Sequence, residues 1–233
     1  MEEDTGKLTH IRDDGQSYSL VDLNRAVVPL LEIVSEPDMH TIEEVRAYAE
    51  ELRNILRYLK VNTGNMEKGV IRFEANVSVK PIGSDTLGTR VEIKNLNSFR
   101  ALERSVAYQI DQQVAKLERG EKVEQETLGW NEITGETYSQ RSKEEAHDYR
   151  YFPEPDLPPL VLEPEWIKKI RSKLPELPNE KLLRFSQIYK IPKDEIKLLI
   201  DDQNIASYFD AVIKSAPKES PHSIASWITG EMF

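Results

Sequence analysis

The 233-residue sequence contains no cysteine and no apolar run long enough to cross a lipid bilayer. The absence of cysteine excludes disulfide bonds, thiolate metal sites and cysteine nucleophiles, and it is compatible with any compartment, the cytoplasm included. A membrane-spanning helix needs about 20 consecutive apolar residues, and no such run occurs. The acidic start, Glu2-Glu3-Asp4, lacks the apolar core of a secretory signal. We therefore expect no membrane partner.

Familiar catalytic motifs are also scarce. The four histidines, His10, His40, His147 and His222, lie far apart and lack the spacing of zinc ligands. The sequence has neither a Walker A phosphate loop nor a GxSxG nucleophile elbow, and no Ser-His-Asp arrangement is suggested. A net charge of −10 and a pI near 5.1 give no sign of the basic patch that nucleic-acid-binding proteins usually carry. Composition thus argues mildly against an RNA partner, although it does not exclude a local cationic face.

The sequence does contain a regular alternation near its centre. From Ile71 to Val79 apolar and polar residues alternate, and a second alternating run covers residues 89–94. A period of two residues is typical of a half-buried strand, and the turn-forming residues between the runs predict an antiparallel hairpin. The polar face of this hairpin would carry Arg72, Glu74, Asn76, Arg90, Glu92 and Lys94.

Two interpretations of this polar face are open from the residues alone. One is a plain solvated surface, because exposed strand faces are usually polar. The other is a metal-assisted phosphate site, because hard oxygen ligands suit Mg²⁺. Glu32 bears on the choice, since it interrupts an apolar run over residues 27–34 that predicts a buried strand. A buried carboxylate needs a metal or a cation as partner, unless Glu32 faces solvent on an edge strand.

Two amphipathic helices are predicted beside the central hairpin. The first covers about residues 41–59, where Thr41 and Glu44 form a capping box. The second covers about residues 99–117 and has an asparagine or serine cap directly before it. We expect both helices to cover the apolar face of the sheet. Residues 11–17 are interpreted as a polar loop.

The sequence changes character after a proline-rich connector. Residues 124–139 predict a second hairpin, and we expect the aromatic residues 148–152 of the connector to dock on the first domain. Beyond it, helical spacing is predicted over residues 166–174, 179–189, 193–200, 204–214 and 223–232. The fold class is therefore α+β: a largely antiparallel sheet with helices on one face in residues 1–159, followed by the start of a small all-α domain in residues 160–233.

Four motifs make the sequence recognisable: Asp22-Leu-Asn-Arg25, Leu31-Glu-Ile-Val-Ser-Glu-Pro-Asp38, Val91-Glu-Ile-Lys-Asn-Leu-Asn-Ser-Phe99 and Asp148-Tyr-Arg-Tyr-Phe-Pro-Glu-Pro-Asp156. In this order they closely resemble the B subunit of the tRNA-dependent amidotransferases (GatB). The resemblance implies a cradle domain similar in fold to the catalytic part of glutamine synthetase. It also implies that ATP and Mg²⁺ activate the side-chain carboxylate of Glu-tRNA(Gln) or Asp-tRNA(Asn), which ammonia then converts into the amide.

The resemblance further implies partners. Members of the family form a heterotrimer with an amidase A subunit, which releases ammonia from glutamine, and a small C subunit, and they act on aminoacyl-tRNA. We expect a cytoplasmic protein of bacterial type or an organellar one. An N-terminal segment and a C-terminal tail domain of the family are not matched, so we expect the chain to begin inside a domain. A second hypothesis is a truncated, non-catalytic scaffold or tRNA-binding fragment.

Residue roles follow from the matched motifs. The resemblance implies metal ligation by Glu3 and Glu32. It implies catalytic roles for Glu32, Glu74 and Lys94, although the family often has aspartate at position 74. Cations and amides would contact the nucleotide, namely Arg72, Asn76, Arg90, Asn95 and Asn97.

Overall fold

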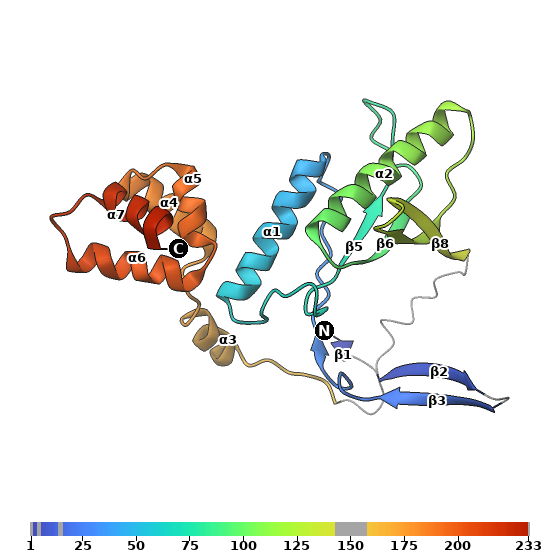
Figure 1. Cartoon of the computed structure of the whole chain (residues 1–233), viewed down its shortest axis with the longest axis horizontal. Coiled ribbons are helices and arrows are strands. Elements are labelled where there is room, and N and C mark those ends of the chain that lie inside the picture. Colours follow the sequence, from blue (N-terminus) through green and yellow to red (C-terminus); the bar gives the residue numbers. More distant parts are fainter. Residues whose placement is uncertain (1, 4–5, 14–15, 143–157, 233) are drawn as a thin grey trace. The chain divides into compact units, whose positions relative to one another are not determined.

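The computed structural model (Figure 1) describes residues 2–3, 6–13, 16–142 and 158–232. It divides into two compact units, residues 1–40 and residues 41–233. None of the described helices is long and apolar enough to cross a membrane. The connector residues 148–152, predicted to dock on the first domain, lie outside the described residues. The domain boundary predicted after residue 159 stays a prediction.

The first unit contains two separate pairs of strands. They are β1 (Glu2–Glu3), β2 (Lys7–Asp13), β3 (Gln16–Asp22) and β4 (Pro29–Leu30). β2 and β3 pair antiparallel over their full length, and β1 pairs antiparallel with β4. The predicted polar loop over residues 11–17 is therefore wrong. The missed signal is Asp14-Gly15, a residue pair that strongly favours a two-residue hairpin connection.

The buried strand expected over residues 27–34 is also wrong. Only the two residues of β4 pair, and the segment after β4 has no regular secondary structure. Val27 has a φ angle of 66°, in the left-handed region, so the chain turns where a strand would need an extended backbone. Leu31 is 62% exposed and Val34 is 78% exposed. An apolar run predicts burial only where a second layer covers it, and among the described residues of this unit none does.

The second unit contains a four-stranded sheet in the order β5–β6–β7–β8. Its strands are β5 (Phe73–Val77), β6 (Val91–Leu96), β7 (Glu126–Asn131) and β8 (Glu136–Ser142). β5 pairs antiparallel with β6, and β7 with β8, which confirms both predicted strand pairings. β6 and β7 are parallel. Helix α2 (Phe99–Glu118) connects them, so β6, α2 and β7 form a β-α-β unit that the sequence analysis did not anticipate.

Both predicted helices of this region are present with the predicted caps. In front of α1 (Ile42–Tyr58), the Thr41 hydroxyl accepts from the Glu44 amide at 3.1 Å, and the Glu44 carboxylate accepts from the Thr41 amide at 3.1 Å. Ser98 caps α2, and its hydroxyl accepts a backbone N–H at 2.9 Å. In Figure 1 α2 runs across the sheet, and α1 packs against α2. Both helices share a core with the apolar face of the sheet, which includes Ala49, Phe73, Val77, Ile93, Leu96, Leu102 and Val106.

A buried glutamine fixes α2 to the edge of the sheet. β5 is an edge strand and therefore has unpaired backbone groups on its outer side. The Gln113 side-chain nitrogen donates to the Val77 carbonyl at 3.0 Å, and its oxygen accepts from the Val79 amide at 3.0 Å. Gln113 thus takes the place of a neighbouring strand and holds the helix at a defined position over β5.

The remaining helices follow the predicted segments closely. They are α3 (Pro164–Arg171), α4 (Pro178–Tyr189), α5 (Lys193–Ile200), α6 (Gln203–Ser215), α7 (Pro221–Trp227) and a short π-helix, η2 (Ile228–Met232). Helices α4 to η2 share a core that includes Phe185, Ile196, Leu199, Phe209 and Ile228. The Tyr58 hydroxyl at the end of α1 donates to the Ile200 carbonyl at 2.8 Å. The chain is of the α+β class, while the cradle and a separate all-α domain stay predictions.

Candidate functional site

Charged side chains gather on the face of the sheet that α1 and α2 leave open. Lys94 Nζ lies 3.4 Å from a carboxylate oxygen of Glu74 and 3.4 Å from one of Glu92. The Thr127 hydroxyl donates to the other Glu92 oxygen at 2.9 Å. We call Glu74, Glu92, Lys94 and Thr127 the Lys94 cluster. Three neighbouring strands, β5, β6 and β7, therefore contribute to one polar site.

Strand alternation produces this cluster. Phe73 and Val77 of β5 are buried in the core, whereas Glu74 and Asn76 between them are exposed. Asn76 lies opposite Glu92 in the register of β5 and β6. The prediction that the polar residues share the face opposite the helices is confirmed for Glu74, Asn76, Glu92 and Lys94, whereas Arg72 and Arg90 precede the two strands. The Lys94 side chain is 26% exposed, so a ligand can reach it.

A β-bulge shapes β6 at Lys94. Lys94 and Asn95 together oppose the single residue Glu74 of β5, and Asn95 has a φ angle of 60°. Among non-glycine residues, asparagine is one of those that adopt this left-handed conformation most readily. The extra residue lets Ile93 and Leu96, three positions apart, both enter the core, while Lys94 and Asn95 stay outside. Bulges are common beside active sites because they redirect a side chain.

A tyrosine lies across the sheet beyond Lys94. Gly129 of β7 is the neighbour of Lys94 in β6 and of Tyr138 in β8. A Cβ atom on Gly129 would clash with the Tyr138 ring and would lie 2.6 Å from the Gln140 amide nitrogen, which itself lies 3.4 Å from the Tyr138 hydroxyl. Glycine therefore makes room for Tyr138 on the polar face. Neither residue was predicted from the sequence, although a glycine inside a strand was an available signal.

The residues predicted to contact the nucleotide lie along the same two strands. Asn76 is in β5 and Asn95 is in the β6 bulge. Arg72 directly precedes β5, Arg90 directly precedes β6, and Asn97 directly follows β6. All five residues are exposed. The structure brings Glu74 and Lys94 into contact, and the roles of all the predicted site residues stay predictions.

The predicted metal residues, Glu3 and Glu32, lie in the first unit. Glu3 is in β1 and Glu32 follows β4, so the pairing of these strands brings the two chain segments together. Glu32 is exposed in an irregular segment, so the expectation that it is buried in an apolar strand is wrong. Among the described residues, no group of three or more histidine, aspartate or glutamate side chains could hold a metal ion. The metal assignment stays a prediction that rests on the resemblance.

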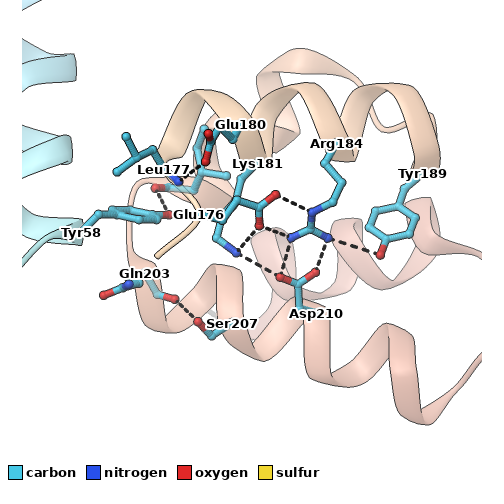
Figure 2. Close-up of polar contacts among 11 residues, drawn as sticks. Tyr58, Glu176, Leu177, Glu180, Lys181, Arg184, Tyr189, Gln203, Ser207 and Asp210 are labelled. Atoms are coloured by element: carbon cyan, nitrogen blue, oxygen red, sulfur yellow. Dashed lines mark hydrogen bonds and ion pairs between the residues drawn. The ribbon is translucent and has the colours of Figure 1, made fainter. Parts of the chain in front are cut away.

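Figure 2 shows a second polar cluster, which sequence analysis missed. Arg184 of α4 lies between two carboxylates, with Nη2 2.6 Å from Glu176 and Nη1 2.7 Å from Asp210 of α6. Lys181 Nζ lies 3.1 Å from Asp210 and 3.3 Å from Glu176. Arg184 also donates to the Tyr189 hydroxyl at 3.4 Å. We call Glu176, Lys181, Arg184 and Asp210 the Arg184 network.

The two cations of the Arg184 network neutralise its two carboxylates. The hydrogen bond from Arg184 is the largest influence on Glu176 and lowers the pKa of its carboxyl group. Burial alone would raise the pKa of Asp210, but hydrogen bonds from Arg184 and Lys181 outweigh it, so the pKa lies below its ordinary value. Perturbed pKa values can mark functional sites. Here they reflect two cations matched to two carboxylates, and we infer that the network holds α4 to α6.

Comparisons with known proteins agree with the resemblance. Residues 1–168 match the model of the GatB/GatE catalytic domain. Over 233 residues the chain is 52% identical to the B subunit of the aspartyl/glutamyl-tRNA(Asn/Gln) amidotransferase of Herpetosiphon aurantiacus, covering 100% of this chain and 48% of that protein. It is 50% identical over 231 residues to the same subunit of Moorella thermoacetica, covering 99% and 48% respectively. The corresponding values for Thermosynechococcus vestitus are 51% over 236 residues, 100% and 47%. The chain spans about half the length of the curated relatives it matches.

Proposed function

The chain belongs to the GatB/GatE family, and from this membership we propose that it supplies part of the catalytic domain of an aminoacyl-tRNA amidotransferase. In the proposed reaction, ATP phosphorylates the side-chain carboxylate of glutamate on tRNA(Gln) or of aspartate on tRNA(Asn). Ammonia then attacks the activated carbonyl carbon, phosphate leaves, and the amide remains on the tRNA. The relatives are named for an amidotransferase of Asp- and Glu-tRNA, which supports both substrates.

The Lys94 cluster is the observation that supports this proposal most directly. A lysine ammonium group is a compact charge that binds phosphate well. Lys94 is anchored on the open face by Glu74 and Glu92 and is still 26% exposed. Arg72 and Arg90 add exposed cations at the starts of the same two strands. We propose that Lys94 and the arginines hold the phosphates of ATP, while Asn76, Asn95 and Asn97 donate hydrogen bonds.

The residues present fit a magnesium ion in part. Mg²⁺ usually takes one or two carboxylates and fills its other positions with water and substrate phosphate. Glu3 and Glu32 are the carboxylates proposed from the family motifs. Glu74 and Glu92 offer two more on neighbouring strands, 3.4 Å from the ammonium group that they share. When bound, the ion neutralises phosphate charge as ATP reacts.

Partner subunits are part of the proposal. The relatives are named as B subunits, which implies at least one other subunit. We propose an amidase A subunit as the source of ammonia, a small C subunit completing a heterotrimer, and aminoacyl-tRNA as the shared substrate. The three relatives named above are bacterial, which favours a bacterial-type cytoplasmic enzyme over an organellar one.

The test uses the full-length protein assembled with its partners. Glu32→Ala should abolish the formation of Gln-tRNA from Glu-tRNA, while glutamine hydrolysis by the amidase stays detectable. A normal rate of amide formation would show that the assignment of Glu32 is wrong. Loss of both activities together with loss of assembly would point to a structural role instead.

A non-catalytic scaffold or tRNA-binding piece is the second candidate. It is compatible with the comparisons, because the chain covers only 48% of the Herpetosiphon aurantiacus relative. The 233-residue chain should therefore be assayed with ATP, Mg²⁺ and ammonium for conversion of Glu-tRNA into Gln-tRNA. We expect little turnover from the chain alone. Robust turnover would exclude the scaffold hypothesis.

A further inference from the structure

A small cavity lies on the second unit, apart from the Lys94 cluster. It has a volume of about 120 Å³ and is lined by Arg100, Ala101, Arg104, Trp130 and Glu132. The first two turns of α2 form one wall, and the end of β7 with the turn after it forms the other. This volume suits a single phosphate group with its neighbouring atoms rather than a whole nucleotide.

The cavity occupies a favourable position in the β-α-β unit. β6 ends at Leu96, α2 begins at Phe99, and the parallel strand β7 ends at Asn131. The cavity therefore lies beyond the carboxyl ends of two parallel strands and at the N-terminus of a 20-residue helix. The positive end of the helix dipole and its amide groups favour an anion at such a position.

Two arginines that have no partner among the described residues line this position. Arg100 and Arg104 are one turn apart on α2, both are exposed, and neither makes an ion pair or a hydrogen bond with another described residue. By contrast, Arg119 at the other end of the same helix pairs with Glu121 at 2.6 Å. The first turn of α2, which is described in full, contains no acidic residue, and Glu132 is the one carboxylate among the described residues that line the cavity with these two cations. Positive charge at the positive end of a helix is unfavourable unless an anion binds there.

The other cavity residues narrow the class of ligand. The Nε1 atom of Trp130 is buried and has no hydrogen-bond partner among the described residues, although buried donors nearly always have one. Glu132 accepts a hydrogen bond from the Ser98 hydroxyl at 3.3 Å. Its carboxylate would repel a bare phosphate, but it can accept a hydrogen bond from a hydroxyl group. In RNA each phosphate has a ribose 2′-hydroxyl close to it.

We propose that this cavity is a ribose-phosphate site, in which Arg100 and Arg104 bind a phosphate of the RNA backbone and Glu132 accepts from the adjacent 2′-hydroxyl. The inference rests on the proposed function, because the tRNA substrate supplies such a backbone. It assigns a local cationic contact to a chain whose net charge is −10. A free ribonucleotide has the same chemistry, so the test separates the two sources.

The test is tRNA binding by the assembled enzyme that contains the full-length protein. The double variant Arg100→Gln/Arg104→Gln is compared with Arg119→Gln, which removes the same type of side chain from the far end of α2. We expect the double variant to bind tRNA about tenfold more weakly and to reduce the slope of log K against log salt by about 1. The control should keep both the affinity and the slope. The thermal unfolding temperature of the double variant should not fall, because the two side chains have no partner to lose among the described residues, and it should rise slightly because two cations leave the positive end of α2.

The remaining outcomes are distinct. A raised KM for ATP with unchanged tRNA affinity would assign the cavity to the free nucleotide instead of the tRNA. Unchanged tRNA affinity, salt slope and KM would overturn the site. Unmodified enzyme that neither binds nor amidates tRNA would instead refute the proposed function. A further variant, Glu132→Gln, keeps an oxygen acceptor and should bind tRNA like the unmodified enzyme, whereas Glu132→Leu should weaken binding.

Discussion

The Lys94 cluster and the Arg184 network contain the same kinds of groups but use them differently. In the Arg184 network two cations meet two carboxylates at distances of 2.6–3.3 Å, and the Asp210 side chain is only 18% exposed. In the Lys94 cluster one ammonium group is shared by two carboxylates at 3.4 Å on an open sheet face. Matched, partly buried charges hold elements together. The Lys94 and Arg184 side chains are equally exposed, at 26%, so the difference lies in the pairing. The longer contacts of Lys94 can exchange a carboxylate for a ligand, as the proposed phosphate site requires.

The largest effect on stability is expected in the Arg184 network. Arg184→Met leaves the partly buried carboxylates Glu176 and Asp210 with Lys181 alone of the network's two cations, so the free energy of unfolding should fall by about 3 kcal/mol. Lys94→Met removes two longer contacts of 3.4 Å, one of them to the 43% exposed Glu74, and should lower it by less than about 1 kcal/mol. Urea denaturation followed by circular dichroism measures both values. Equal losses in the two variants would contradict the distinction between the two clusters.

Acid should act on the same network. The folded-state pKa values of Glu176 and Asp210 are lowered, so the stability that these carboxylates contribute is fully present above their unfolded values of about 4. This contribution is lost as the pH falls through the folded values. The urea midpoint should therefore drop below about pH 4, and the drop should be smaller in Arg184→Met. Parallel pH curves for the two proteins would show that the network does not cause the acid sensitivity.

A smaller effect on stability is expected at Asn95, where two substitutions separate the role of the backbone angle from the role of the side chain. Glycine adopts the φ angle of 60° freely, whereas a β-branched residue is strained there. Asn95→Val should lower the free energy of unfolding by about 1 to 3 kcal/mol, and Asn95→Gly should change it by less than about 1 kcal/mol. If the Asn95 amide contacts the nucleotide, Asn95→Gly should still raise the KM for ATP. Unchanged kinetics in a stable Asn95→Gly enzyme would limit Asn95 to shaping the bulge.

Short-range sequence patterns predicted the helices and strands whose formation depends on residues that are close together in the sequence. The period of α1 and its Thr41–Glu44 capping box marked the helix, and the alternation around Glu74 placed this residue and Lys94 on one face. The apolar run after Val27 wrongly predicted a buried strand. The left-handed conformation of Val27 turns the chain, and no layer of the described residues covers the run. The hairpin of β2 and β3 was missed although Asp14-Gly15 marked it.

Contacts between distant residues could not be predicted in this way. The parallel pairing of β6 with β7 joins Glu92 to Thr127, which lie 35 residues apart, and no local period encodes it. Arg184 and Asp210 are 26 residues apart on two different helices. Only the fold brings such charges together. The close approach of Tyr138 to Gly129 was also missed, although a glycine inside a strand signals that another group approaches closely.

The most direct test of the central claim is amide formation by the Lys94→Met enzyme, with the full-length protein assembled with its partners. The claim is that the Lys94 cluster acts on the ATP-dependent step, whereas the Arg184 network is structural. We expect Lys94→Met to lose amide formation on Glu-tRNA at least about 100-fold, as when a charged transition-state contact is removed, while its glutamine hydrolysis and unfolding midpoint stay close to those of the unmodified enzyme. Arg184→Met, assayed where it is folded, should keep amide formation. A normal rate of amide formation in a folded Lys94→Met enzyme would contradict the claim.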